Sequence, residues 1–230
     1  MNERQVEIKR WFDWVYQKKS FSYLRPPEAY DIFISILKPK ENGIALDVAC
    51  GLGLLLKKLI EKGVISYGID ISTEAINQSK TYCPEANLTI GNAENLPFDN
   101  NTFDYITCIG SLERMLDRRK VLAEQKRVAK KNATFCYMVR NSENFTWKYL
   151  LNPLKLKNSS GNQDALSYDE WKNLFESCGL QILNVYPDHW PYLRLRKSLF
   201  PFRTDYGKLR RFPFNICYAY EFIFLLSKNE

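Results

Sequence analysis

Short apolar runs rich in β-branched residues alternate with longer helical patterns from Ile44 onward. This alternation is typical of β–α–β units, in which parallel strands are joined by helices that cover the sheet. The expected strands are residues 44–48, 64–69, 88–90, 103–109, 133–139, 180–186 and 216–226. The expected helices are residues 52–61, 73–79, 112–128 and 168–178. The sequence therefore predicts an α/β fold built around a mainly parallel sheet.

The length of 230 residues suits one globular domain. We expect that domain over residues 41–230, preceded by an N-terminal helical lid over residues 1–40. The segments near 140–167 and 188–214 interrupt the alternation. Ligands of open α/β sheets bind beyond the carboxyl ends of the strands. We therefore expect these two segments at that end of the sheet, on the side that holds the acceptor substrate.

Composition argues against several classes of protein. Six scattered cysteines form no C-x-x-C pair and His189 is the only histidine, so no metal site is expected. No apolar run reaches the roughly 18 residues of a membrane span, and the polar N-terminus is unlike a signal peptide. The expected compartment is the reducing cytoplasm.

A glycine-containing loop follows the first strand: Asp47-Val48-Ala49-Cys50-Gly51-Leu52-Gly53. Small residues let the backbone approach a ligand closely at the start of a helix. A dinucleotide fingerprint starting at Gly51 would need glycine at the position of Leu56, so the phosphate-binding version is disfavoured. Asp70 ends the second strand 19 residues after Gly51, where its carboxylate can accept hydrogen bonds from ribose hydroxyls of NAD or of S-adenosylmethionine.

Three further segments separate these two cofactors. They are Gly91–Phe98, Asn101–Ile106 and Gly110–Glu113. With the glycine loop and Asp70, they resemble the successive motifs of class I S-adenosylmethionine-dependent methyltransferases, of the small-molecule, methyltransferase domain 11 type. The resemblance covers about residues 40–185. It implies a Rossmann-like, doubly wound sheet of seven strands, mostly parallel with an antiparallel C-terminal strand, and helices on both faces. It also implies S-adenosylmethionine as the cofactor and S-adenosylhomocysteine as the product.

The resemblance also assigns a cofactor site. Its residues are Asp47, Ala49, Cys50, Gly51 and Gly53 for the methionine part, Asp70 for the ribose, Ile71, Asn92, Ala93 and Glu94 for the adenine, and Ile109, Gly110 and Ser111 for the amino-acid end and the methyl-transfer site. The chain departs from the family pattern at three positions. Ala49 replaces a glycine and fits the turn if its φ is negative, Asn92 replaces a common aspartate, and Arg114 stands where many relatives have histidine.

A sulfonium methyl is already activated, so the protein mainly aligns the acceptor and excludes water. A general base is optional, and the weak candidates are His189 and Glu113. Tyr16 and Tyr23 are candidates for the lid over the cofactor, where aromatic faces favour the sulfonium charge. Core packing is the equally weighted alternative for both tyrosines.

Basic residues concentrate in the second half of the chain, where residues 113–230 carry 21 basic and 12 acidic side chains. A basic patch of Arg194, Arg196, Lys197 and Arg203 is interleaved with aromatic residues. Such a patch can hold a phosphorylated ligand or rest on an anionic membrane, and a solvated loop is the alternative. Nucleic acid is disfavoured as a partner because Gly110-Ser111-Leu112 is unlike the Asp/Asn-Pro-Pro-aromatic segment of base amino-group methylases.

These observations predict transfer of a methyl group from S-adenosylmethionine to a small-molecule acceptor, with anionic and lipid-linked molecules as candidates. Three alternatives stay open: a catalytically inactive S-adenosylmethionine-binding regulatory protein, a nucleic-acid methyltransferase and, most weakly, an NAD-dependent oxidoreductase.

Overall fold

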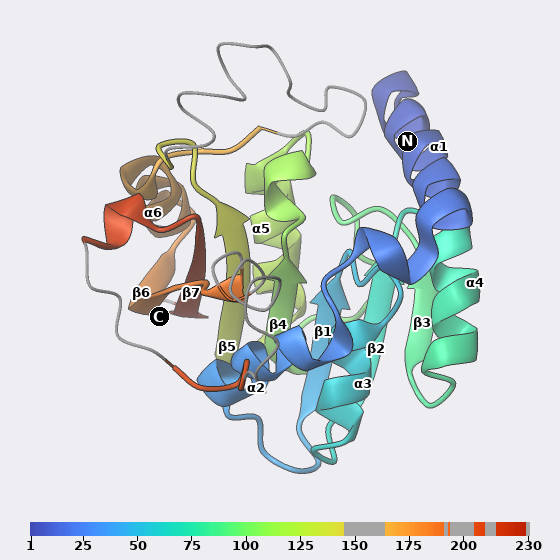
Figure 1. Ribbon diagram of the computed structural model, residues 1–230, viewed down its shortest axis with the longest axis horizontal. Helices are drawn as coiled ribbons and strands as arrows, with labels where there is room; N and C mark the ends of the chain where they lie inside the picture. Colours follow the sequence, from blue (N-terminus) through green and yellow to red (C-terminus); the bar gives the residue numbers. More distant parts are fainter. Residues whose placement is uncertain (145–163, 191–192, 194–204, 210–214, 229–230) are drawn as a thin grey trace.

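The computed structural model describes residues 1–144, 164–190, 193, 205–209 and 215–228. Its centre is one seven-stranded sheet with the order β3-β2-β1-β4-β5-β7-β6 (Figure 1). The strands are β1 (Ile44–Val48), β2 (Ile65–Asp70), β3 (Asn87–Ile90), β4 (Phe103–Ile109), β5 (Ala129–Arg140), β6 (Leu180–Pro187) and β7 (Glu221–Lys228). β7 runs antiparallel to both of its neighbours, β5 and β6, whereas the other pairs are parallel. The predicted fold class is confirmed.

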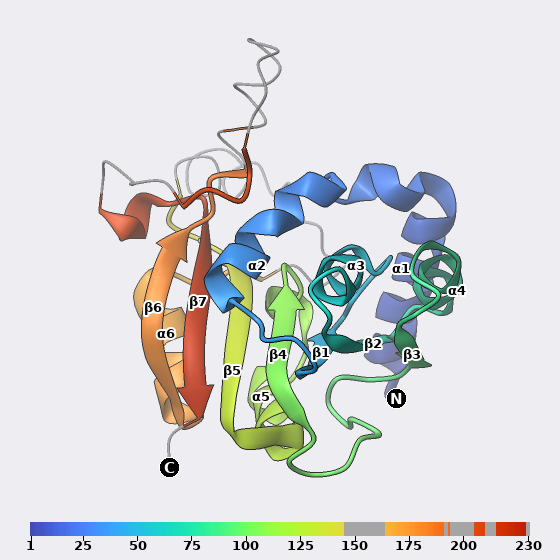
Figure 2. The same cartoon turned by 90° about the horizontal axis from the view of Figure 1, so that it is seen from below.

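Helices cover both faces of the sheet (Figure 2). They are α2 (Asp31–Leu37) and α3 (Leu54–Ile60) on one face, α5 (Arg118–Val128) and α6 (Tyr168–Ser177) on the other, and α4 (Thr73–Tyr82) against α3 and β3. Side chains of β5 alternate between these faces: Cys136 and Met138 pack with α2 and α3, and Phe135 and Tyr137 pack with α5 and α6. Each face therefore has its own apolar core.

Two element boundaries differ from the sequence prediction. The helix expected over 112–128 is a 3-10 turn, Leu112–Arg114, followed by α5, which begins after the N-cap Asp117. The last strand was expected from residue 216, but residues Ile216–Tyr218 form a 3-10 turn and β7 begins only at Glu221. Because β7 is antiparallel to β5, its first residue lies level with the carboxyl ends of the parallel strands.

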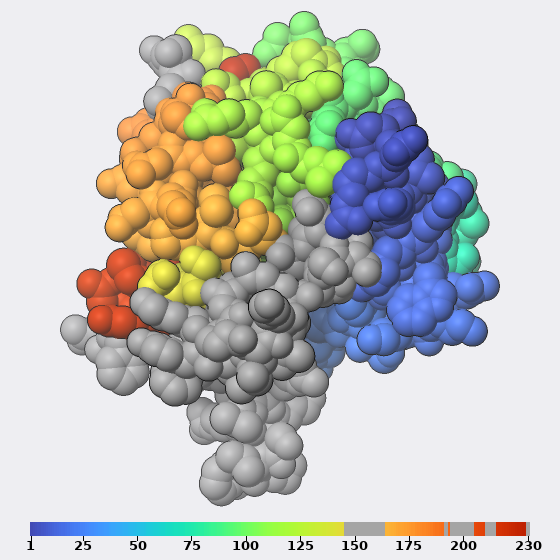
Figure 3. Space-filling view, turned by 90° about the horizontal axis from the view of Figure 1, so that it is seen from above, coloured from blue at the N-terminus to red at the C-terminus, as the bar shows by residue number. Residues whose placement is uncertain are grey.

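The N-terminal region is helical. It consists of α1 (Glu3–Lys19) and two 3-10 turns, η1 (Ser20–Tyr23) and η2 (Pro27–Tyr30), which lead into α2. Asp13 attaches α1 to the start of α4, because its Oδ1 accepts hydrogen bonds from the Ser72 hydroxyl (2.7 Å) and the Glu74 amide (3.1 Å). In the view from the side at which the parallel strands end, α1 (dark blue) lies against the segment that follows β4 (lime green; Figure 3). No described helix has the length and apolar character that crossing a membrane requires.

Candidate active site

Two adjoining cavities lie at the carboxyl ends of the central strands. A narrow one lies beside the ends of β2 and β3 and is lined by Asp70, Ile71, Asn92, Ala93 and Glu94, with α1 as its roof. The other, of about 690 Å³, extends from the end of β1 across β4 and β5 to the start of β7. The two cavities have five lining residues in common: Phe12, Tyr16, Ala49, Ser111 and Arg114. A ligand in the narrow cavity can therefore reach a second molecule in the larger one.

Asp70 holds the glycine loop in place from the end of β2. Its carboxylate accepts hydrogen bonds from the Gly51 amide (2.9 Å) and the Ser72 amide (2.8 Å). Burial raises the pKa of Asp70 to about 6, although these backbone donors oppose the shift. The side chain still lines the narrow cavity, so its remaining lone pairs can accept from the hydroxyls of a bound ribose.

The loop itself has the left-handed backbone that a close approach needs. Gly51 has φ +54°, and a Cβ at this position would lie 2.9 Å from the Tyr16 hydroxyl oxygen. Ala49 has φ +60°, so the condition under which its methyl group would fit the turn without strain, a negative φ, is not met. A left-handed alanine costs about 1–2 kcal/mol. This strain sits in the loop that lines both cavities.

Asp47 supplies a second buried carboxylate at the end of β1. It is 3% exposed and accepts a hydrogen bond from the Thr107 hydroxyl of the neighbouring strand β4 (2.6 Å). Burial raises the pKa of Asp47 to about 7. Among the described residues, no lysine or arginine forms an ion pair with it, although it lines the larger cavity. A buried carboxylate without a cation fits the ammonium group of an amino-acid ligand, such as the methionine part of S-adenosylmethionine.

The adenine end implied by the sequence lies under α1. Asn92 Oδ1 accepts a hydrogen bond from the Glu94 amide (3.0 Å), which fixes the turn after β3. Glu94 in turn accepts a hydrogen bond from Gln5 of α1 (2.9 Å). The N-terminal helix is thus attached to the loop that would bind adenine.

The two tyrosines proposed for a lid from the sequence lie at the cavities. Tyr16 is 5% exposed and lines both of them, and Tyr23 lines the larger one. Their rings meet edge to face with centroids 5.9 Å apart. The guanidinium of Arg114 lies 5.6 Å from the ring centroid of Phe12, where the two cavities join.

Several predicted site residues lie away from the cavities. Gly53 lines neither cavity, and its left-handed backbone instead packs closely on Ser79 of α4. His189 also lines neither. Glu113 is fully buried outside both linings, with its carboxylate 3.6 Å from Arg140 Nε. The basic patch of Arg194, Arg196, Lys197 and Arg203 lies outside the described residues.

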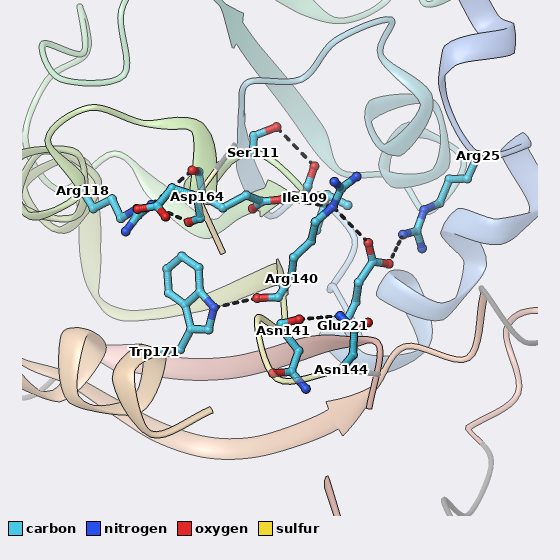
Figure 4. A network of polar contacts seen from close by, with 11 residues as sticks. Arg25, Ile109, Ser111, Arg118, Arg140, Asn141, Asn144, Asp164, Trp171 and Glu221 are labelled. Atoms are coloured by element: carbon cyan, nitrogen blue, oxygen red, sulfur yellow. Dashed lines mark hydrogen bonds and ion pairs between the residues drawn. The ribbon is translucent and has the colours of Figure 1, made fainter. Parts of the chain in front are cut away.

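Sequence reasoning missed a network of charges at the far end of the larger cavity (Figure 4). Arg25 contacts Asp188 (2.6 Å) and Glu221 (3.2 Å), and Glu221 also lies 3.5 Å from Arg140. The signal in the sequence is slight: a charged residue ends the apolar run of β5 and another begins that of β7. No group of histidine, cysteine, aspartate and glutamate in the described segments has the arrangement of a metal site.

Comparison with known proteins identifies a methyltransferase domain in the part of the chain that runs from β1 to β5. Residues 46–137 match the methyltransferase domain family model. The chain is 30% identical to the ubiquinone biosynthesis O-methyltransferase of Methylococcus capsulatus over 57% of each protein. It is 31% identical to the demethylmenaquinone methyltransferase of Bacillus subtilis, over 64% of this chain and 68% of that one.

A solved structure extends the similarity of the fold. A TehB-like S-adenosylmethionine-dependent methyltransferase from Corynebacterium glutamicum superimposes with a TM-score of 0.62 at 16% identity. The match covers 94% of this chain and 96% of that chain. The fold is therefore shared well beyond the segment in which the sequences agree.

Proposed function

This chain belongs to the S-adenosylmethionine-dependent methyltransferases, and we propose that it transfers the methyl group to a small, ring-bearing acceptor held in the larger cavity. One observation carries the proposal: the cavity lined by the residues proposed for adenosine shares five lining residues with a second cavity of about 690 Å³. Ser111, which the sequence places beside the methyl-transfer site, lines both.

When bound, S-adenosylmethionine supplies a methyl group that its sulfonium charge has already activated. The chain has residues suited to holding it: Asp47 for the ammonium group, Asp70 for the ribose and the Ala49–Gly51 turn for the chain between them. Tyr16 lines both cavities and Tyr23 lines the larger one, so in this proposal their rings exclude water from the bound methyl group. Catalysis then rests mainly on the alignment of the acceptor with the methyl group.

The wall of the larger cavity supports a ring as acceptor. Apolar and aromatic side chains, including Tyr30, Met138 and Trp190, line it together with the charged network. The relatives act, by their names, in ubiquinone biosynthesis and on demethylmenaquinone. Because Arg25 and Arg140 already lie against carboxylates, an uncharged quinol-type ring suits this wall better than a phosphorylated acceptor. A lipid tail on that ring is compatible with the proposal.

Two measurements test it. Calorimetric titration with S-adenosylhomocysteine and with NAD should show binding of the first alone. Incubation with methyl-labelled S-adenosylmethionine should then label a benzoquinol or naphthoquinol, each offered with and without a short isoprenoid tail. The Asp70→Ala variant is the control for signal that does not depend on the cofactor site. Binding of S-adenosylhomocysteine without labelling of any quinol would contradict the proposed acceptor class and favour a regulatory role.

A further inference from the structure

Three neighbouring strands bring charged residues into one row beside the larger cavity. Arg140 ends β5 and is in register with Glu221, the first residue of β7. Asp188 follows β6, and its amide donates a hydrogen bond to the Glu221 carbonyl oxygen (2.9 Å). Met138 and Ile223 lie two residues from Arg140 and Glu221 on the same strands and pack with α2. Strand alternation therefore places Arg140 and Glu221 on the α2 face of the sheet, where Arg25 meets Glu221.

The row contains more buried negative than positive groups. Glu113, Asp188 and Glu221 are 0%, 1% and 5% exposed, and the two guanidinium groups of Arg25 and Arg140 serve all three. A buried carboxylate without a matching cation is costly, so binding one proton relieves the imbalance. The cluster is thus built to accept a proton.

Glu221 is the carboxylate on which that proton can reach a ligand. Of the three, it alone lines the larger cavity, whereas Glu113 and Asp188 lie behind it. Burial raises the pKa of Glu221 to about 7, since the attraction of Arg25 and Arg140 only partly offsets burial and the repulsion of Asp188 and Glu113. A base with a pKa near the working pH is the most effective kind.

Arg140 provides the complementary group. Its guanidinium lies 3.5 Å from Glu221 and 3.6 Å from Glu113, and its side chain makes no hydrogen bond to any described residue. It lines the same cavity and reaches toward Ile109 and Ser111 at the end of β4 (Figure 4). Its Nε is buried beside the two carboxylates, so the two terminal nitrogens are the donors that it can offer to an oxygen atom of the acceptor.

We propose that Glu221 is a catalytic base, which takes the proton from an ionisable hydroxyl of the acceptor while Arg140 holds the oxygen anion that results. This inference rests on the proposed function. The acceptor O–H bond breaks and a carboxylic O–H bond forms on Glu221. The acceptor oxygen then bonds to the methyl carbon as the methyl–sulfur bond breaks, and sulfur keeps that electron pair. Glu221 returns its proton to solvent after the product leaves.

The test uses 4-nitrophenol as a hydroxyl-bearing probe and the full chain saturated with S-adenosylhomocysteine. Calorimetry in two buffers of different ionisation enthalpy measures the protons taken up on binding. At about pH 8 the free probe and Glu221 are both mainly ionised, but in contact they must share a proton, so uptake should approach about one proton per probe. The Glu221→Gln variant should take up none.

Glu85→Gln is the control, because Glu85 also lies beside a basic side chain, Lys57, but is outside both the charge row and the cavity. It should keep the proton uptake of the unmodified chain. Equal uptake by Glu221→Gln, or none by the unmodified chain, overturns the assignment of Glu221. The unmodified chain is decisive even if Glu221→Gln does not fold. Failure of the saturated chain to bind 4-nitrophenol overturns the hydroxyl acceptor, whereas failure to bind S-adenosylhomocysteine overturns the proposed function instead.

Discussion

The two ends of the proposed active site, one for the cofactor and one for the acceptor, are built by different means. The cofactor end, around β1 and β2, relies on backbone turns and two carboxylates, Asp47 and Asp70, that follow strands close together in the sequence. The acceptor end, around β5 and β7, relies on ion pairs between residues as far apart as Arg25 and Glu221. The cofactor end should therefore depend on local conformation, and the acceptor end on the pairing of buried charges.

The largest effect should come from breaking the charge network. Arg25→Met leaves Asp188 and Glu221 without their closest cation, and removal of one partner from a buried pair costs about 3–5 kcal/mol. Urea unfolding measures this loss, which should be smaller at low pH, where the carboxylates can bind protons. Lys58→Met removes the partly exposed pair with Asp31 and should cost about 1 kcal/mol or less. Similar losses of unfolding free energy in both variants would show that burial of the network adds nothing to the effect of removing a cation.

Backbone conformation at the cofactor end can be tested with a pair of glycines. Gly51→Ala adds a Cβ at φ +54° that meets the Tyr16 hydroxyl, so we expect S-adenosylhomocysteine to bind about 10–30-fold more weakly. Gly63→Ala introduces a similar strain at φ +73°, but its Cβ meets only the flexible side chain of Glu41. This control should lose stability and keep its affinity. Equal affinities in the two variants would falsify the role of Gly51 in the cradle.

Asp47 should have opposite effects on folding and on cofactor binding, and the pH dependence of stability can distinguish the two. The pKa of Asp47 is raised from 3.8 to about 7 by burial, so the unliganded chain loses stability as pH rises from about 4 to about 7. Asp70 and Glu221, whose pKa values are also raised, contribute to the same slope. Asp47→Asn should therefore make the slope smaller, stabilise the unliganded chain by up to about 4 kcal/mol at about pH 8, and weaken S-adenosylhomocysteine binding.

Asp104→Asn is the control with the opposite sign, because Lys130 and the Ile44 amide lower the pKa of Asp104. That variant should be less stable than the unmodified chain at neutral pH. Thermal unfolding at several pH values measures both. The same slope in Asp47→Asn as in the unmodified chain contradicts the assignment.

The smallest effect should come from the attachment of α1, the proposed lid. Asp13→Ala removes two hydrogen bonds between α1 and the start of α4, worth about 1 kcal/mol, so S-adenosylhomocysteine should dissociate about five-fold faster in stopped-flow measurements. Ser167→Ala removes a comparable cap from α6 and should leave the dissociation rate unchanged. If both variants release the ligand at the rate of the unmodified chain, α1 does not limit access to the cavity.

Sequence reasoning was most successful where strand, turn and ligand contact lie within a few residues. Asp47, Gly51, Asp70 and Asn92 each lie at the carboxyl end of a strand or just beyond it, so prediction of the strand also placed the residue. It did not decide the conformation of Ala49, where the turn imposes a left-handed backbone on a residue with a Cβ. Gly53, which was also predicted at the cofactor, has a second explanation in its close contact with Ser79 of α4, and its role at the cofactor stays a prediction.

The sequence by itself determined the parallel half of the sheet and the cofactor end, because motif and strand are contiguous there and the apolar pattern reveals both. Only the tertiary structure decided the acceptor end. The sequence predicted Glu221 in the middle of a strand over residues 216–226. In the structure β7 begins at Glu221 and runs antiparallel to β5, which places this residue beside the larger cavity. Its partner Arg25 lies 196 residues away, and no local pattern encodes the pairing of two buried charges at that separation.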